Sequence, residues 1–166
     1  MSIGDSALDF FSEEEIKKEK QLNQFPNDKY IITSIQNEDK FKKYQMISIR
    51  HLKSDKKYFI ASLGGVIFFK DNIEKCHPQK KVIEKEFDEV FNSASKKSAR
   101  IKKTYDKSGN SFADITEYTL LDGSVIQVTC DDWSQKLTDE NYLIDALNIN
   151  LQSSAYRKFL LNEAYK

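Results

Sequence analysis

The sequence predicts an α+β fold, in which a curved antiparallel sheet of about five to seven strands carries helices packed on one face. Three observations lead to this prediction. Several segments of strand length alternate apolar and polar residues, others repeat apolar residues at helical spacing, and short turns join successive strands. The length of 166 residues fits a single α+β domain covering residues 1–166, with an N-terminal helical unit and a C-terminal helix.

Capping signals predict the helices at the two ends of the chain. Ser12 followed by Glu15 forms a capping box, because the hydroxyl and the carboxylate each satisfy a free backbone amide at the start of a helix. Near the C-terminus, Ser153 or Ser154 is expected to cap a last helix whose apolar residues recur at helical spacing.

Period-two alternation and turn signals predict the strands. Gly64-Gly65 is expected to form a bulge or a sharp bend, and Asp122-Gly123 a two-residue hairpin turn. The segment after Trp133 is expected to be a polar loop. The expected strands are residues 29–35, 43–52, 58–63, 66–69, 100–105, 111–121, 124–130 and 142–151.

A central helix is predicted over residues 73–91, where apolar residues recur at helical spacing opposite a charged face. Asp71 and Glu74 form a second capping-box pattern at its start. Pro78 lies inside this span, and it is expected either to kink the helix or to begin a second one.

Charge and hydropathy exclude some classes of function. The 26 Lys and Arg balance the 26 Asp and Glu, which does not favour a nucleic-acid partner, and no apolar stretch approaches the ~18 residues of a membrane span. One basic run, Lys96, Lys97, Arg100, Lys102 and Lys103, could contact phosphates. Without interleaved aromatic residues it is better explained as a solvated sheet edge.

The two cysteines are the most informative pair of residues. Cys76 lies in the predicted central helix, and Cys130 ends a predicted strand. Their placement is compatible with a disulfide between helix and sheet, which would indicate an oxidising compartment. The alternative is two buried free thiols in a cytoplasmic protein. A redox-active pair is disfavoured because the Cys-x-x-Cys spacing is absent.

A disulfide would bring His77 close to Asp131 and Asp132, and a histidine beside two carboxylates can bind a metal. The spacing typical of metal ligands is absent, so a polar surface cluster is the preferred interpretation. His51 is expected to be exposed or hydrogen-bonded rather than catalytic.

No catalytic or cofactor-binding residue is assigned. Asp114 and Glu117 could act as an acid/base pair, but nothing distinguishes them from other carboxylates. Phosphate loops, dinucleotide fingerprints, zinc-protease helices and nucleophile elbows are absent from the sequence. Some aromatic residues could line a ligand groove, although core packing is the preferred interpretation. These are Tyr58, Phe59, Phe68, Phe69 and Trp133.

Five segments carry a resemblance to a known group of proteins. Residues 1–18, 73–76, 83–91, 105–109 and 128–134, the last with its Cys-x-Asp-Trp-Ser pattern, resemble small uncharacterised exported proteins of marine alphaproteobacteria. The resemblance implies a signal peptide that the given chain lacks, a periplasmic location and a disulfide between Cys76 and Cys130. It implies no known chemistry.

The sequence therefore predicts a non-catalytic exported domain, without a cofactor, that binds a protein or another ligand in the periplasm. One alternative is a hydrolase-like enzyme with an unrecognised site on the sheet, and another is a self-associating structural protein. A cytoplasmic location is the alternative if the thiols are free.

Overall fold

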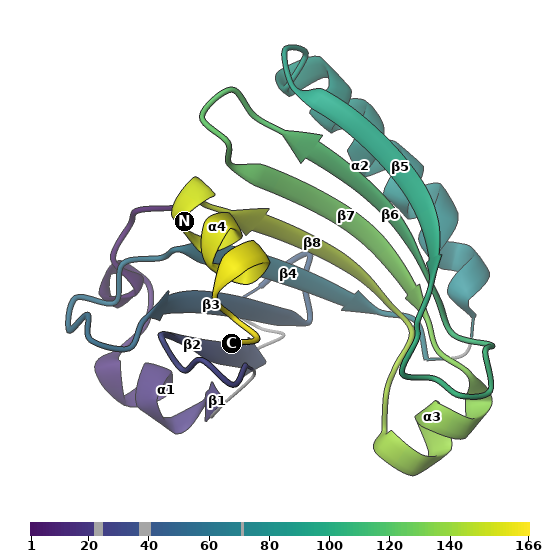
Figure 1. Cartoon of the computed structure of the whole chain (residues 1–166), viewed down its shortest axis with the longest axis horizontal. Coiled ribbons are helices and arrows are strands. Elements are labelled where there is room, and N and C mark those ends of the chain that lie inside the picture. Colours follow the sequence, from purple (N-terminus) through teal and green to yellow (C-terminus); the bar gives the residue numbers. More distant parts are fainter. Residues whose placement is uncertain (22–24, 37–40, 71) are drawn as a thin grey trace. The chain divides into compact units, whose positions relative to one another are not determined.

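The structure is a computed structural model that describes residues 1–21, 25–36, 41–70 and 72–166 (Figure 1). It confirms the α+β class, with an antiparallel sheet that is not closed, an N-terminal helix and a C-terminal helix. The helices are α1 (Glu13–Lys18), α2 (Cys76–Val90), α3 (Gln135–Asn141) and α4 (Ser154–Asn162), with 3₁₀ turns η1 (Ala7–Asp9) and η2 (Ile73–Lys75). The strands are β1 (Lys20–Gln21), β2 (Tyr30–Gln36), β3 (Met46–Leu52), β4 (Ser62–Phe68), β5 (Ser95–Lys102), β6 (Phe112–Thr119), β7 (Val125–Asp132) and β8 (Ala146–Gln152). Hydrogen bonding orders them β1-β2-β3-β4-β8-β7-β6-β5.

The chain divides into two compact units. Unit 1 comprises Met1–Gly65, Asp122–Val125 and Asn150–Lys166, and unit 2 comprises Val66–Leu121 and Ile126–Ile149. A single domain over residues 1–166 therefore stays a prediction.

In unit 1, the register of β2 and β3 decides which side chains share a face. Ile32 lies opposite Arg50, and Thr33 lies opposite Ile49. Residues opposite each other on paired strands point to the same face, and successive residues point to opposite faces. Thr33 and Ile49 therefore share one face of the pair, and Ile32 and Arg50 share the other.

Helix α1 covers the face that carries Ile49. The hydroxyl of Thr33 donates to the carbonyl of Ile16 in α1 (3.5 Å), and both isoleucines are buried. Ser12 and Glu15 begin α1 with the predicted capping box. The buried residues of this core are Ala7, Phe11, Ile16, Ile35, Ile47, Ile49 and Ile60.

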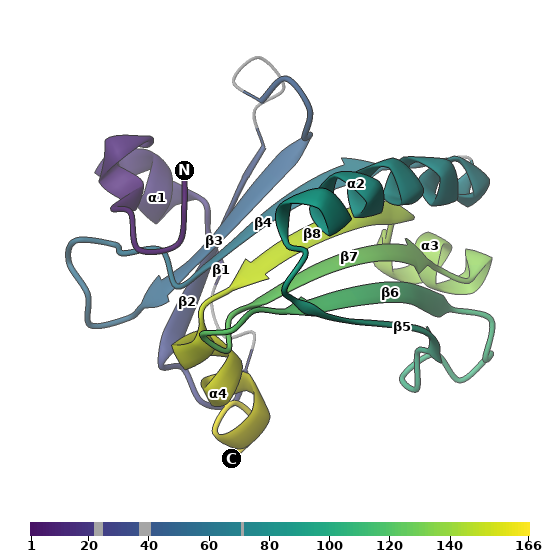
Figure 2. The same ribbon diagram turned by 90° about the horizontal axis from the view of Figure 1, so that it is seen from above.

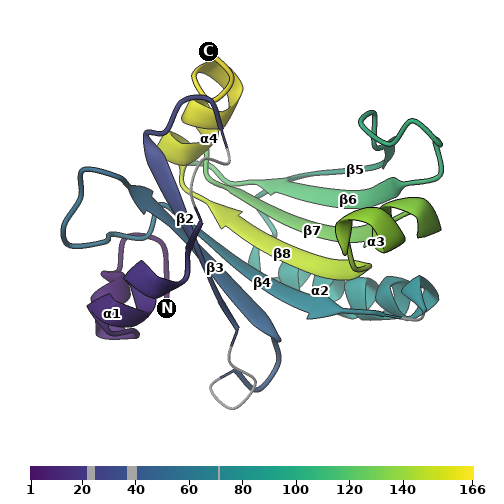
Figure 3. The same cartoon turned by 90° about the horizontal axis from the view of Figure 1, so that it is seen from below.

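Helix α4 packs against the opposite face of β2. Figure 3 shows α4 beside this strand. The ring centroids of Tyr30 and Tyr156 are 4.9 Å apart, and those of Tyr30 and Phe159 are 4.8 Å apart. Ser153 caps α4, as one of the two predicted alternatives. The helices of unit 1 thus use both faces of β2 and β3, which differs from the predicted packing on one face, because both faces carry large apolar side chains.

The predicted bulge at Gly64-Gly65 is wrong, since β4 runs through both glycines as one strand. Their role is close packing. A Cβ at Gly64 would lie 2.5 Å from the Ser48 hydroxyl, and one at Gly65 would lie 2.7 Å from the ring of Tyr44. Residues 58–61, predicted as strand, lie before β4, and Tyr58 has a positive φ of 53°.

In unit 2, α2 runs roughly parallel to the strands β6 and β7 (Figure 2), and its residues contact β6. The ammonium of Lys80 donates to the Thr116 hydroxyl (3.1 Å), and the Tyr118 hydroxyl donates to the Glu84 carbonyl (3.1 Å). The rings of Phe87 and Tyr118 meet edge to face at 5.9 Å. Positions four residues apart on α2 thus meet alternate residues of β6, as helix and strand periods require.

The start of α2 differs in detail from the prediction. Asp71, the predicted cap, lies outside the described residues. Asn72 caps the preceding η2 turn by accepting from the Glu74 amide (2.9 Å). Pro78 is the third residue of α2, where a missing amide hydrogen breaks no intrahelical hydrogen bond, so α2 continues through it.

Two further predictions about local structure are corrected. The segment after Trp133 is helix α3 rather than a loop, and Ser134 caps it by accepting from the Leu137 amide (3.4 Å). The turn between β6 and β7 is longer than two residues. Of its central residues Gly123 alone has a positive φ (81°), while the Asp122 carboxylate accepts from the amide (2.8 Å) of Ser124.

We expect Gly65→Ala to lower the free energy of unfolding by about 1–3 kcal/mol, because the added methyl group overlaps the ring of Tyr44. Urea denaturation measures the change. In a Tyr44→Leu background the same substitution is expected to cost less, and an equal cost in both backgrounds would contradict this explanation.

Candidate functional site

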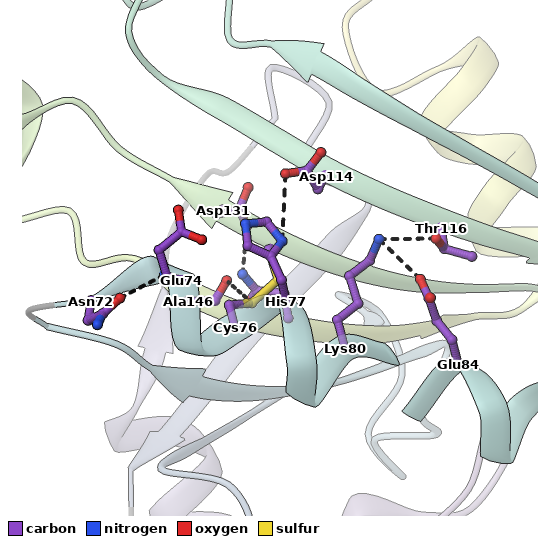
Figure 4. Close-up of a disulfide and its surroundings, with 12 residues drawn as sticks. Asn72, Glu74, Cys76, His77, Lys80, Glu84, Asp114, Thr116, Asp131 and Ala146 are labelled. Atoms are coloured by element: carbon purple, nitrogen blue, oxygen red, sulfur yellow. Dashed lines mark hydrogen bonds and ion pairs between the residues drawn. A yellow bond between two sulfur atoms is a disulfide. The ribbon is translucent and has the colours of Figure 1, made fainter. Parts of the chain in front are cut away.

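The predicted disulfide between Cys76 and Cys130 is present in unit 2, with the two Cα atoms 6.0 Å apart (Figure 4). Both residues are fully buried, and the bond joins the first residue of α2 to β7. It therefore attaches the start of α2 covalently to the sheet that α2 covers.

His77 lies close enough to Asp132, one of the two predicted carboxylates, to interact with it electrostatically, and it also meets Asp114. Its Nδ1 lies 3.9 Å from Asp114, which also accepts from Arg100 at 3.0 Å (Figure 4 shows His77 and Asp114). Asp132 lies 3.7 Å from the same Arg100, and burial raises the pKa of Asp132. Asp131 points away from Cys130, since successive strand residues alternate, and it pairs instead with Lys103.

This cluster is a set of ion pairs beside the disulfide. Among the described residues, no group of three or more His, Cys, Asp or Glu side chains is arranged to hold a metal ion. Asp114 and Glu117 do not form a pair, because three positions along β6 place them on opposite faces. Glu117 instead accepts from the side-chain amide of Gln127 at 2.8 Å.

Four residues of the basic run, Lys96, Lys97, Arg100 and Lys102, lie on β5, which begins at Ser95, earlier than predicted, and stands at one end of the strand order. These four are exposed, whereas Lys103 follows the strand, is partly buried and pairs with Asp131. Lys96 pairs with Asp88 at 2.7 Å, and Arg100 pairs with Asp114. The run is thus a solvated edge with part of its charge already matched.

His51 is buried rather than exposed, with 3% of its surface accessible. Its Nδ1 lies 2.9 Å from the carbonyl of Leu52, and its ring meets that of Tyr58 at 4.9 Å. Of the aromatic residues considered for a groove, Tyr58 and Trp133 line separate cavities, whereas Phe59 is half exposed.

The best candidate binding site is a pocket of about 400 Å³ in unit 1 that Arg50 helps to line. Arg50 lies on the face of β3 opposite the α1 core, so its side chain points toward the α4 side. Sequence analysis did not identify this residue. The sequence feature that could have identified it is an arginine inside a strand, between Ile49 and His51, both of which are buried in the structure.

The guanidinium of Arg50 is poorly matched by the groups around it. It donates to the Ser48 hydroxyl at 3.3 Å and interacts with the Tyr156 hydroxyl. Within the described residues no carboxylate lies at ion-pair distance from it. Burial lowers the pKa of Arg50 below the ordinary arginine value, because removal from water disfavours the charged form.

The rest of the pocket adds polar groups and an apolar wall. The side chains of Asn150 and Gln152 come from β8, and Arg157 adds a second guanidinium from α4. Phe25 and Tyr165 meet edge to face at 5.5 Å. The complete lining is Phe25, Arg50, Asn150, Gln152, Tyr156, Arg157, Leu160, Leu161 and Tyr165.

Comparison of the chain with protein-family models, curated protein sequences and solved structures finds no match. In the residues that the structure describes, no helix has the length and apolar character needed to cross a bilayer.

We expect the variant Cys76→Ala/Cys130→Ala to lose about 4 kcal/mol of unfolding free energy, because the bond closes a long loop in the unfolded chain. Urea denaturation of both proteins measures this loss. The oxidised protein should show no thiol that reacts with an alkylating reagent. Alkylation of both cysteines without reductant would contradict the disulfide.

The buried carboxylate of Asp106 is expected to make the stability of the protein depend on pH. Asp106 accepts from the Ser111 hydroxyl (2.6 Å) and from the amide and hydroxyl of Ser108 (both 2.9 Å). These bonds, that from Ser111 foremost, lower the pKa of Asp106 well below its ordinary range. Ser111 in turn accepts from the Ser134 amide at 2.8 Å, which links this loop to the start of α3.

Folding lowers the pKa of Asp106, so the ionised carboxylate stabilises the folded protein. This stabilisation is complete above the ordinary aspartate pKa of about 3.9, and it is lost as the pH falls toward the lowered pKa. We expect the carboxyl NMR signal of Asp106 to remain in its ionised position while exposed aspartates titrate. We also expect Asp106→Asn to lower the melting temperature at neutral pH. Titration of Asp106 together with the exposed aspartates would contradict this.

Proposed function

We propose that the protein is an exported, periplasmic binding domain that holds a small organic anion in the Arg50 pocket. The observation that carries this proposal is a partly buried guanidinium that lines a cavity without a carboxylate partner among the described residues. An unmatched buried charge destabilises the folded protein, and an anionic ligand would remove that penalty.

The lining favours an anion with an apolar body. Arginine binds carboxylates through two parallel hydrogen bonds, and the amides of Asn150 and Gln152 can donate further ones. Phe25, Leu160 and Leu161 supply an apolar wall. A volume of about 400 Å³ lies in the range of small-molecule sites.

The same lining favours binding over hydrolysis. The residues that the structure places around this pocket include no carboxylate, imidazole or thiol. Those are the groups that most often transfer protons or act as nucleophiles at neutral pH. The pocket thus supports the non-catalytic hypothesis rather than the hydrolase alternative.

The proposed location rests on the disulfide between Cys76 and Cys130, which persists in oxidising compartments. The resemblance of residues 1–18 and 128–134 to exported bacterial proteins supports the same compartment. Fractionation of cells that express the native gene tests it, and recovery of the protein in the cytoplasm with both thiols reduced would contradict it.

Calorimetric titration with phenylacetate and with phenylacetamide tests the binding site, because the two probes differ in charge and share an apolar body. We expect phenylacetate to bind and phenylacetamide to bind much more weakly. Arg50→Met should reduce the affinity for phenylacetate about 10- to 100-fold, the value of a charge-assisted hydrogen bond.

Arg100→Met is the matched control, since it removes an arginine from β5 and leaves the pocket intact. Arg50→Met is expected to keep or raise the melting temperature of the free protein, because it removes an unmatched buried charge. The proposal fails if phenylacetate does not bind, or if it binds wild type and Arg50→Met equally.

A further inference from the structure

Unit 2 contains a second cavity, of about 710 Å³, which is separate in its residues from the Arg50 pocket. Trp133 follows β7, and Asp145 immediately precedes β8, so residues far apart in the sequence meet at this cavity. Ile73 and Ile144 add apolar surface to the lining, and Lys70 adds a cation.

Asp145 is a partly buried carboxylate that lacks a cationic partner. It accepts from the backbone amide of Trp133 at 2.8 Å. In the part of the chain that the structure describes, no lysine, arginine or histidine lies at ion-pair distance from it. Burial raises the pKa of Asp145, and the carboxylates of Asp132 and Asp131 raise it further.

Trp133 already binds an ammonium group within the protein. The Nζ of Lys103 lies 4.0 Å from the centre of the indole ring, and the same Lys103 pairs with Asp131. An ammonium ion held between a ring and a carboxylate is a recognised mode of cation binding. Trp133 and Asp145 offer the cavity the same two kinds of group.

The remaining lining narrows the class of cation. Lys70 lines the cavity and would repel a second positive charge on the ligand. Ile73 and Ile144 favour an apolar body. We propose that this cavity binds a monovalent organic ammonium ion, with its charged group on Asp145 and its apolar body against Trp133 and the isoleucines.

Trp133 is the single tryptophan of the chain, so its fluorescence reports directly on this cavity. Titration of the intact, oxidised protein with phenethylammonium is expected to change the tryptophan emission in a saturable manner. The neutral 2-phenylethanol, which has the same apolar body, is expected to bind at least about 10-fold more weakly, as the loss of one charged contact predicts.

Asp145→Asn removes the charge and retains an oxygen that can accept from the Trp133 amide. We expect it to weaken phenethylammonium binding about 10- to 100-fold and to leave 2-phenylethanol unaffected. Asp9→Asn is the matched control, since it removes the same charge from an exposed position in unit 1. Circular dichroism establishes that both variants are folded.

Three results would overturn the proposal. They are absence of phenethylammonium binding by both fluorescence and calorimetry, equal affinity for 2-phenylethanol, and unchanged affinity in folded Asp145→Asn. If that variant does not fold, the comparison of the two probes on the wild-type protein decides. Phenylacetate binding through Arg50 is independent of Asp145, so either site can fail without the other.

Discussion

Burial of Ile47 and Ile49 against α1 determines which way Arg50 points. Side chains alternate along a strand, so two isoleucines committed to one face place Ser48 and Arg50 on the other. A shift of one residue in the register of β3 would bury the arginine in the apolar core and expose the isoleucines. The apolar core on one face is therefore what keeps the guanidinium at the cavity on the other face.

In unit 2 a covalent bond and polar contacts help to hold α2 against the sheet. Cys76 is the buried residue of that helix, and it is bonded to Cys130. Beyond the disulfide, α2 contacts β6 through hydrogen bonds such as that from Lys80 to Thr116, and through the edge-to-face rings of Phe87 and Tyr118.

Charged side chains that line the two cavities differ from those elsewhere in whether they have a partner of opposite charge. Arg100 pairs with Asp114, and Lys103 pairs with Asp131, so cations near the disulfide and near Trp133 have carboxylate partners. Arg50 and Asp145 line cavities without such partners among the described residues, and burial disfavours the charged form of each. The two proposed ligands therefore carry opposite charges.

The sequence by itself determined the local structure. Capping residues such as Ser12 and Ser153 and the alternation of strand residues identified most elements, because these signals act over a few neighbouring residues. It missed α3, whose polar sequence has no apolar period, and it misjudged Gly64-Gly65, whose role is close packing with distant side chains. The folded structure was needed to choose the disulfide between Cys76 and Cys130 over two free thiols, and to show which residues line the two cavities.

Arg50 meets Asn150 and Tyr156, and Trp133 meets Asp145, through strand pairing and helix packing between distant segments. No local pattern encodes those distances. Whether a charge has a partner depends on all the groups around it, so an unmatched charge can be recognised only in the folded chain.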